Sequence, residues 1–466
     1  MGGAGNEEKA VVENREWYLA AYAPEGVPTS DHLKLRTVPL SLAVDSIPDR
    51  HVIVQNLLIS VDPYQRTRLT GLEEGLYFPQ FKLNELHHPP IKAKGIHSSL
   101  LLQHIQKAEK MGGAGNEEKA VVENREWYLA AYAPEGVPTS DHLKIRTVPL
   151  SLAVDSIPDR HVIVQNLLIS VDPYQRTRLT GLEEGLYFPQ FKLNEAITAF
   201  SVGRVIRSTD SNYKEGDLVL NPFSPVAEYY VVPAELLIRK VDPSSGVPLP
   251  DFLSSLGVPG FAAWVGIEVL GDPKPGSNVF ISAAAGAVGM YAGQLAKLKG
   301  CRVIGSTGSD EKVKLIKEEF GYDDAFNYNK ETDLDAALSK YFPDGIDVYL
   351  DNVGGKMLEA VLNHVNVHAR IPVCGMISQY KKIWTEREGV RNLLNIVGKE
   401  VRLEGFMVGS YLDRFGDFTK QMQSQIIEGK ISSKFKIYHG IESFLESLGS
   451  LFTSSNVGKV IIEVNP

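Results

Sequence analysis

The spacing of apolar positions divides the chain into segments of two kinds. In the first kind, short apolar runs alternate with turn residues, which is typical of a small β-rich domain. Its predicted strands lie at 161–171, 203–206, 218–220 and 227–232. From about Asp251 onward, helical and strand-like runs alternate, and this predicts an α/β fold with a doubly wound parallel sheet. The tail from about Ser432 returns to short strand-like runs, so we expect it to rejoin the β-rich domain.

Within the alternating part, strands are expected at 279–282, 302–305, 346–350, 370–374 and 401–405, with helices such as 311–320 and 356–363 between them. Polar residues and glycines follow these strands, and ligands bind at such strand ends in open parallel sheets. In the tail, strands are expected at 435–438 and 457–464, with an acidic helix near 442–451.

One strand end has the pattern of a dinucleotide site. The run from Val279 to Gly289 predicts a buried strand, a turn of small residues and a helix that ends at Gly300. In the G-x-G-x-x-G pattern, Ala284 occupies the first position and Gly286 the second. Such a turn lets a pyrophosphate approach the free N–H groups of the helix. Because similar turns also occur at purely structural corners, the second strand one helix length later is needed to favour the nucleotide interpretation.

The end of that second strand indicates which dinucleotide is bound. NAD sites place an acidic residue there, whereas this chain has Gly-Ser-Thr-Gly-Ser at 305–309 and then Lys312. A hydroxyl-rich turn followed by a cation favours the 2′-phosphate of NADP. Asp310 and Glu311 are expected to begin the next helix, where acidic side chains are favourable.

Composition narrows the functional classes. The chain has 466 residues, of which 43% are hydrophobic and 23% charged, and its formal charge of −9 argues against nucleic-acid binding. No run is apolar enough to span a membrane, and the first residues lack the apolar run of a signal peptide, so a cytoplasmic location is expected.

No metal site is expected. The chain has two cysteines, Cys301 and Cys374, which are expected to be buried thiols and are too few for a four-cysteine zinc site. His364 and His368 are spaced i, i+4 on a predicted helix end, but the glutamate of a zinc-protease motif is missing, so a structural role is favoured. No Cys, Asp or Glu lies among four further histidines, which are assigned to a solvated linker: His87, His88, His97 and His104.

A long internal repeat is the most unusual feature. Residues 1–85 recur as 111–195 with one difference, Leu35 against Ile145, which indicates a recent partial duplication or a merged gene model. Only the second copy continues in register into a strand-like run. The first copy is therefore interpreted as an appended segment, ordered in part or disordered, that could compete for the place of the second copy by a domain swap. The expected divisions are 1–110 (duplicated segment and linker), 111–240 (β-rich domain), 241–430 (nucleotide-binding domain) and 431–466 (return to the β-rich domain).

Several ordered motifs resemble one known family. Residues 111–466 resemble the zinc-independent medium-chain dehydrogenase/reductases, most closely the plant NADP-dependent alkenal double bond reductases, which are related to prostaglandin reductase. The stretches that carry the resemblance are 170–176 (Ser-Val-Asp-Pro-Tyr-Gln-Arg), 283–289, 326–328, 352–358, 374–380 and 456–459. The resemblance implies a Rossmann domain beside a GroES-like catalytic domain, NADPH as cofactor, and a homodimer.

The implied reaction is reduction of the carbon–carbon double bond of an enal or enone by hydride transfer to its β-carbon. The implied cofactor-binding residues are Ala284, Gly286, Ala287, Val288, Gly289, Gly308, Lys312, Tyr328, Asn352, Cys374, Gly375, Met376, Ile377, Ser378, Tyr380, Phe406 and Asn456. Tyr174 and Tyr380 are implied to face the substrate. Two alternatives remain: a quinone oxidoreductase of the same superfamily, and a nucleotide-binding protein without turnover.

The implied chemistry needs a hydrogen-bond donor at the carbonyl oxygen, where negative charge develops, and a neutral phenol can donate. The 2′-hydroxyl of the cofactor could donate instead, and the α-carbon proton could come from water. Structural interpretations also remain: Tyr174 as a turn aromatic, Lys312 as a solvated lysine and Asn352 as part of a turn. Two positions depart from the family pattern, because Phe200 replaces a tyrosine and Asp310 replaces a lysine.

Overall fold

The computed structural model describes residues 11–19, 33–41, 121–182 and 188–464. The chain divides into two compact units, Met1–Gly115 and Asn116–Pro466, and each is described by itself. The predicted histidine-containing linker lies outside the described residues. The finer domain boundaries expected from the sequence remain predictions.

The two copies of the repeat form the same antiparallel hairpin. In the first unit, β1 (Val11–Leu19) pairs with β2 (Leu33–Ser41), and in the second, β3 (Val121–Leu129) pairs with β4 (Leu143–Ser151). Every register pair of the first hairpin recurs 110 residues later in the second. Valine, tryptophan and tyrosine favour strands, so this short stretch forms the same hairpin in both units.

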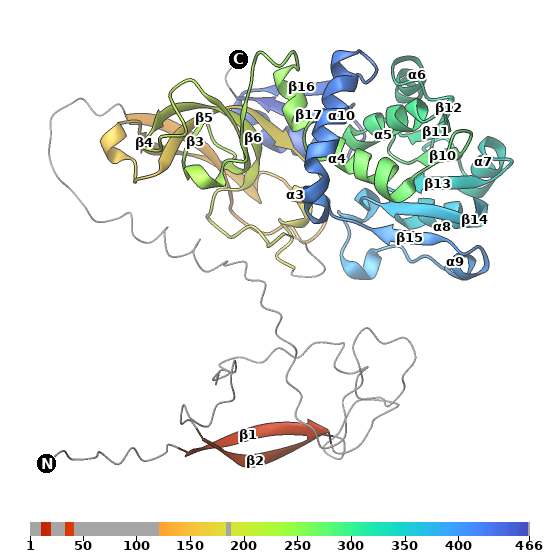
Figure 1. Ribbon diagram of the computed structural model, residues 1–466, viewed down its shortest axis with the longest axis horizontal. Helices are drawn as coiled ribbons and strands as arrows, with labels where there is room; N and C mark the ends of the chain where they lie inside the picture. The colour runs from red at the N-terminus through yellow and green to blue at the C-terminus, as the bar shows by residue number, and fades with distance from the viewer. Residues whose placement is uncertain (1–10, 20–32, 42–120, 183–187, 465–466) are drawn as a thin grey trace, which may run out of the picture. The chain divides into compact units, whose positions relative to one another are not determined.

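The expected doubly wound parallel sheet is confirmed, with six strands instead of five (Figure 1). In spatial order they are β12 (Asp324–Asn327), β11 (Arg302–Thr307), β10 (Asn278–Ile281), β13 (Ile346–Leu350), β14 (Val365–Val373) and β15 (Arg402–Gly405). The sequence pattern missed β12 because it has four residues, begins with an aspartate and buries only Ala325 and Phe326.

Helices cover both faces of this sheet. They are α4 (Val258–Trp264), continued as η5 (Val265–Gly271), α5 (Ala287–Leu298), α6 (Asp310–Glu319), α7 (Leu334–Tyr341), α8 (Gly355–His364), α9 (Leu394–Gly398) and α10 (Phe415–Ile427). One apolar cluster packs α4 and α5 against the sheet, and a second packs α7 and α8 against the side chains of the opposite face. Phe280 is central to the second cluster, with its ring centroid 5.1 Å from that of Tyr349 and 5.9 Å from that of Phe326.

The helix boundaries follow from local sequence. Gly300 has a φ of +78°, which favours glycine, and it ends α5 as expected. The side chain of Ser309 accepts the backbone N–H of Lys312 and so caps α6, an interaction that contributes about 1 kcal/mol. Asp310 and Glu311 occupy the first turn of α6, where their negative charges favour the positive helix end.

The β-rich part contains a seven-stranded sheet. Its order is β16 (Phe435–His439), β17 (Lys459–Glu463), β5 (His161–Val171), β6 (Thr198–Ser208), β7 (Leu218–Pro225) and β9 (Arg239–Val241), and β8 (Tyr229–Pro233) also pairs with β5. The tail strand β17 runs antiparallel to β5, with Val460 opposite Val171. The largest apolar cluster joins this sheet to the parallel one, because it includes Leu168 and Val202 as well as Phe261 of α4.

Short helices complete the second unit. They are α3 (Tyr174–Thr177), α11 (Phe444–Ser450), η2 (Val154–Ser156), η3 (Ala234–Leu236), η4 (Leu249–Leu253), η6 (Ile377–Gln379), η7 (Trp384–Glu386), η8 (Val408–Arg414) and η9 (Ile441–Ser443). The hairpin β3–β4 is attached through Trp127, whose indole N–H donates to the carbonyl of Ile441 at 2.7 Å. Its main chain also bonds to Val226 and Ile197, at 2.9 and 3.0 Å.

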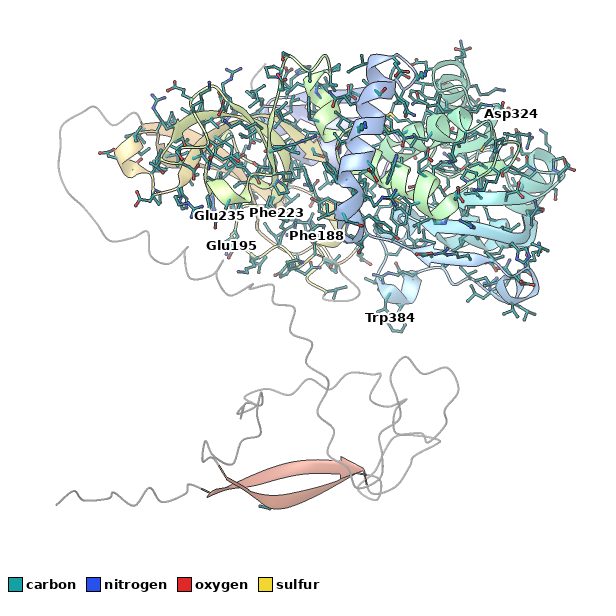
Figure 2. The ribbon with its side chains drawn as sticks, viewed as in Figure 1. Phe188, Glu195, Phe223, Glu235, Asp324 and Trp384 are labelled. Atoms are coloured by element: carbon teal, nitrogen blue, oxygen red, sulfur yellow. The ribbon has the colours of Figure 1, made fainter. Side chains whose placement is uncertain are left out.

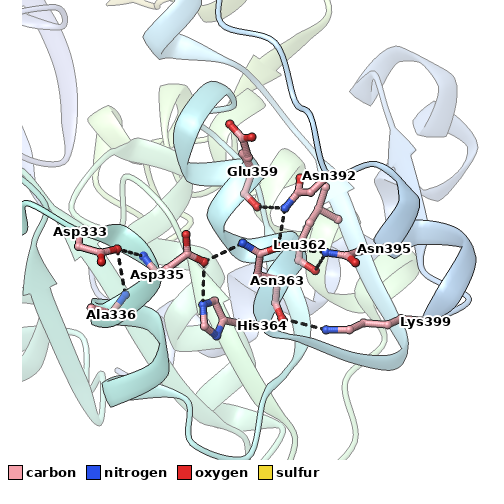
Figure 3. A network of polar contacts seen from close by, with 10 residues as sticks. All are labelled: Asp333, Asp335, Ala336, Glu359, Leu362, Asn363, His364, Asn392, Asn395 and Lys399. Carbon is pink, nitrogen blue, oxygen red and sulfur yellow. Dashed lines mark hydrogen bonds and ion pairs between the residues drawn. The ribbon is translucent and has the colours of Figure 1, made fainter.

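The expectation that His364 and His368 share a helix is wrong. Helix α8 ends at His364, and His368 lies in β14 with a φ of +63°. The strand begins at Val365, earlier than its apolar run suggested, because its first residues include polar and exposed ones. His364 Nε2 lies 3.0 Å from Asp335 Oδ1 within the polar network of Figure 3, where Asn363 also donates to Asp335. This histidine therefore has a structural partner.

The described ranges contain neither a membrane-spanning helix nor a cluster of metal ligands. None of their helices combines the length and apolar character needed to cross a membrane. In the same ranges, no group of three or more His, Cys, Asp or Glu side chains is arranged to hold a metal ion.

Either copy of the repeat should suffice for a folded second unit. Deleting residues 1–110, or instead deleting residues 86–195, leaves two chains that differ only by Ile145 or Leu35. Because Ile145 is 38% exposed, this exchange should cost little stability. We expect both deletions to match the full chain in melting temperature and in the NADPH-dependent turnover that the family resemblance implies.

Calorimetry and an NADPH oxidation assay check this. The control deletes residues 1–195 and removes both hairpins together with β5, so it should not fold. Lost turnover in both single deletions would show that the two copies are needed together.

Candidate functional site

A cavity of about 700 Å³ lies at the carboxyl ends of β14 and β15. Its wall on the parallel-sheet side includes Cys374 and Gly375 after β14 and Phe406 after β15. The β-rich part contributes Pro134, Thr177, Thr180 and Leu182. The remaining lining residues are Val373, Met376, Gln379, Tyr380, Lys382, Arg387, Glu388, Gly405, Met407, Ser410 and Tyr411. This is the edge of a doubly wound sheet where ligands bind.

Tyr380 presents a neutral phenol to this cavity. Its oxygen accepts the backbone N–H of Met376 at 3.1 Å, which fixes the ring and leaves the phenolic hydrogen to donate elsewhere. Burial raises the pKa of Tyr380 above its ordinary value, so the group stays protonated. A Cβ atom at Gly375 would lie 3.0 Å from the phenol oxygen, so glycine at this position makes room for it.

The thiol of Cys374 lines the cavity as a neutral group. Burial, together with the nearby carboxyl group of Asp351, raises the pKa of Cys374 to about 12. A thiol with this pKa is a poor nucleophile at neutral pH. The expectation of two buried thiols is met fully at Cys301, whereas Cys374 is partly exposed.

Tyr174 begins α3 and packs in an aromatic group instead of on the cavity wall. Its ring centroid lies 5.3 Å from that of Phe188, which in turn lies 6.3 Å from that of Phe223. Phe188 and Phe223 are labelled in Figure 2. The cavity is lined instead by Thr177, one helical turn later. The substrate-facing role of Tyr174 remains a prediction.

The small-residue corner between β10 and α5 has a tight backbone. Ala283 adopts a φ of +49°, a conformation that L side chains rarely adopt, and its carbonyl accepts the N–H of Gly286 at 2.9 Å. A Cβ atom on Gly289 would lie 2.5 Å from the Ala283 oxygen, so a side chain cannot be placed there without movement. A Cβ atom on Gly286 would meet only that oxygen, at 3.1 Å. The backbone of the corner is thus open to a ligand on the side of Gly286.

The first turn of α5 begins at Ala287 and Val288, with Gly286 as its N-cap. Their N–H groups belong to the helix end that favours an anion. The tail crosses this corner, because Gly458 donates its N–H to the carbonyl of Ala285 at 2.8 Å. Asn456, predicted to bind the cofactor, lies two residues earlier on the same segment.

Three predicted residues meet at the end of β11. Lys312 is 9% exposed and donates to the backbone oxygen of Ser454 at 2.7 Å. The hydroxyls of Tyr328 and Ser454 lie 3.1 Å apart, and a Cβ atom on Gly308 would lie 2.8 Å from the Tyr328 oxygen. Burial and the positive charge of Lys436 lower the pKa of Lys312. We call Gly308, Lys312, Tyr328, Lys436 and Ser454 the lysine cluster.

The lysine cluster has the chemistry of an anion site. Lys436 donates to the carbonyl of Ser455 at 3.1 Å, so both lysines bond to one loop through neutral oxygens. Because two like charges repel, a phosphate between them would relieve the repulsion and accept charge-assisted hydrogen bonds. Asp310, which replaces a family lysine, bonds to Lys330 and Asn327.

Asn352 connects the corner to the cavity. Its side-chain amide donates to the carbonyl of Ser282 at 2.9 Å, immediately before the corner. Its own carbonyl accepts the N–H of Ile377 at 3.1 Å, and Ser378 Oγ donates to the carbonyl of Val353 at 2.6 Å. The loop that carries Tyr380 is therefore bonded to the loop after β13.

Sequence reasoning missed Ser282, Thr177 and the two tail residues Lys436 and Ser454. The lysines and serines of the tail resemble ordinary surface residues in the sequence. Lys436 is placed by the pairing of β16 with β17, which a local pattern does not reveal. Ser282 carried a usable signal, since it ends the strand predicted at 279–282 and directly follows β10.

Similarity to known proteins shows the family of the chain. Family models match residues 125–239 as an N-terminal domain of oxidoreductases and residues 287–424 as a zinc-binding dehydrogenase. A 2-alkenal reductase (NADP(+)-dependent) of Nicotiana tabacum is 42% identical over 345 residues, which are 74% of this chain and 98% of the relative. The chain is a medium-chain dehydrogenase/reductase.

Further relatives of this dehydrogenase/reductase are similar over the same part. The (+)-pulegone reductase of Mentha piperita is 39% identical over 348 residues, covering 74% of this chain and 99% of that protein. Among solved structures, CurA from Vibrio vulnificus has a TM-score of 0.67 and 31% identity, covering 74% of this chain and 99% of its own. CurA has also been solved in complex with NADPH, at 30% identity and the same TM-score.

The contact at Gly289 should be essential to the corner. Substituting Gly289→Ala places a methyl group 2.5 Å from a backbone oxygen, so we expect a loss of about 1–3 kcal/mol in the free energy of unfolding. Nucleotide affinity should fall as well, because the helix end shifts. Chemical denaturation and NADPH fluorescence titration measure the two effects.

Gly409→Ala is the matched control, since a Cβ atom there has no heavy atom within 4 Å. It should change neither quantity. A Gly289→Ala protein with unchanged stability and NADPH affinity would contradict the tight contact.

Proposed function

We propose that the protein reduces the α,β carbon–carbon double bond of 2-alkenals and enones with NADPH, by hydride transfer to the β-carbon. The observation that carries this proposal is the Tyr380 phenol, fixed by the Met376 N–H and facing a cavity whose wall is bonded to the nucleotide corner. The similarity to the tobacco 2-alkenal reductase and to pulegone reductase supports the same reaction.

The residues present fit NADPH. The open backbone at Gly286 and the first N–H groups of α5 would hold the pyrophosphate. The lysine cluster would hold the 2′-phosphate, whose negative charge would offset the repulsion between Lys312 and Lys436. Asn352, Cys374, Gly375, Met376, Ile377, Ser378, Phe406 and Asn456 would line the rest of the cofactor site. When bound, NADPH supplies the hydride.

Tyr380 would stabilise the charge that develops on the carbonyl oxygen of the substrate. The Tyr380 oxygen already accepts the Met376 N–H, so the phenolic hydrogen is free to donate to the carbonyl oxygen of the substrate. A raised pKa suits this role, since the phenol remains a donor over the whole physiological pH range. The α-carbon proton can then come from water, so no strong acid is needed in the cavity.

Reduction of quinones is the alternative within the superfamily. Solved quinone oxidoreductases share the fold, at 17–20% identity, and this likeness shows the fold alone. A panel of 2-alkenals, enones and quinones, each assayed with NADPH, separates the two activities. The homodimer implied by the family and the cytoplasmic location remain predictions.

Lys312 should set the preference for NADPH. Substituting Lys312→Met removes one cation of the lysine cluster, so we expect the KM for NADPH to rise about 10- to 100-fold, the worth of one charge-assisted hydrogen bond. The KM for NADH, which lacks the 2′-phosphate, should change little. Initial rates with both cofactors measure the difference.

Lys314→Met is the matched control from the same helix, since the Lys314 side chain is 73% exposed. It should leave both constants unchanged. Equal losses with NADPH and NADH in Lys312→Met would instead assign Lys312 a structural role.

Tyr380 should act on turnover more than on cofactor binding. Removing the hydroxyl in Tyr380→Phe should lower kcat about 100-fold, the usual effect of losing one donor to a developing oxyanion. NADPH affinity should remain within about twofold, because the ring still packs. In the unaltered protein, the raised pKa predicts that kcat does not fall with rising pH before the range of an ordinary tyrosine, near pH 10.

Tyr341→Phe, a tyrosine outside the cavity, serves as the control and should have full activity. If Tyr380→Phe retained full kcat, the donor would have to be another group, such as the cofactor ribose.

A further inference from the structure

A buried ion pair lies between the cofactor corner and the helix that carries Tyr174. Lys459 is 1% exposed, and its Nζ lies 2.6 Å from Asp172 Oδ1 and 2.8 Å from the carbonyl of Val171. The second oxygen of Asp172 accepts the hydroxyl of Ser170. Two charges have thus been removed from water and satisfied with several hydrogen bonds.

Each partner is tied to a different side of the site. Lys459 directly follows Gly458, whose N–H donates to the corner at Ala285, and Gly458 forms a parallel bridge with Gly286. Any movement of Lys459 along the strand would therefore move the segment that crosses the corner.

Asp172 begins α3 through its main chain. Its carbonyl accepts the N–H of Gln175 at 3.1 Å, and its N–H donates to Gln175 Oε1 at 2.9 Å. Tyr174 and Thr177, the latter on the cavity wall, follow on this helix. The orientation of α3 thus depends on where Asp172 is held.

A pair of this kind is a poor source of stability. Removing two charges from water costs about as much as their attraction returns, and apolar replacements of buried pairs are often as stable. The pair does fix the distance between β17, which carries Lys459, and α3, which follows Asp172. Lys459 donates and Asp172 accepts hydrogen bonds in defined directions.

We propose that Asp172 and Lys459 are positioning residues that hold α3 and the cavity wall in register with the cofactor corner. The proposal rests on the proposed reductase function. Through this pair, the placement of the substrate depends on the segment at Gly458, and so on the cofactor site. Neither residue touches the reacting atoms.

The test compares single variants with the double variant. Asp172→Asn or Lys459→Met alone leaves one buried charge without its partner, so both stability and turnover should fall. The double variant Asp172→Asn with Lys459→Met contains no lone charge, so its melting temperature should recover most of the loss. Its kcat with 2-hexenal should stay about 10- to 100-fold low, the expected effect of a small misplacement. Its Kd for NADPH should be raised.

A milder variant and a remote pair complete the design. Ser170→Ala removes one hydrogen bond from Asp172 and should lower kcat about threefold without unfolding the protein. Lys299 and Glu268, whose charged atoms lie 2.7 Å apart, form a partly buried pair away from the cavity. The double variant Lys299→Met with Glu268→Gln should keep full kcat and Kd, whatever its melting temperature.

The outcomes separate the two proposals. If the unaltered protein reduces no enal, the proposed function fails, and the Kd for NADPH alone decides the role of the pair. If enals are reduced, wild-type kcat and Kd in both Ser170→Ala and the Asp172/Lys459 double variant would overturn the positioning role. Kinetic recovery in parallel with melting temperature would likewise assign the pair a structural role only.

Discussion

The site depends on a close backbone contact at Gly289. Without a side chain there, α5 can begin directly against the carbonyl of Ala283, and its first N–H groups face outward past Gly286. The left-handed conformation of Ala283 has an energetic cost that is tolerated because Ala284 bonds to Ser306 and Gly286 bonds back to Ala283. A corner fixed from several sides does not reorganise when an anion arrives, and such preorganisation is what makes a backbone site effective.

The tail of the chain joins the remaining parts to this corner. Residues 454–459 make three of these contacts. The carbonyl of Ser454 accepts a hydrogen bond from Lys312, the N–H of Gly458 donates to Ala285, and Lys459 pairs with Asp172. The tail then continues as β17 beside β5 in the β-rich sheet, so one segment contacts the nucleotide corner at Gly458 and pairs with the β-rich part directly after it. The cavity has walls from both parts, Thr177 and Thr180 on one side and Cys374 and Phe406 on the other.

Residues that act through local patterns were predictable, and those that act through distant contacts were not. The strand, small-residue turn and helix around Gly286 appear in eleven consecutive residues, and the capped start of α6 at Ser309 is equally local. By contrast, Lys436 is more than a hundred residues from Lys312 in the sequence, and its place is set by strand pairing. The error at His368 has the same origin: a polar strand start is stabilised by the neighbouring strand, which periodicity alone does not reveal. Tyr174 was predictable as part of a motif, but the packing of its ring on Phe188 depends on a loop fourteen residues later.

The repeat separates the contacts within the hairpin from the contacts that the hairpin makes with the rest of the second unit. Nearly identical sequence forms the same pairing in β1–β2 and β3–β4, so the register of the hairpin follows from its own residues. In the second unit, β3–β4 donates hydrogen bonds to the carbonyls of Glu195, Val226 and Ile441. Glu195 belongs to the repeat, whereas Val226 and Ile441 lie in sequence that occurs once in the chain. The chain contains these two acceptors once, and in the second unit β3–β4 bonds to both of them. The copy that is continuous with residues 196–229 is nine residues from β5 and has the smaller loop-closure cost, which explains why the second copy completes the fold.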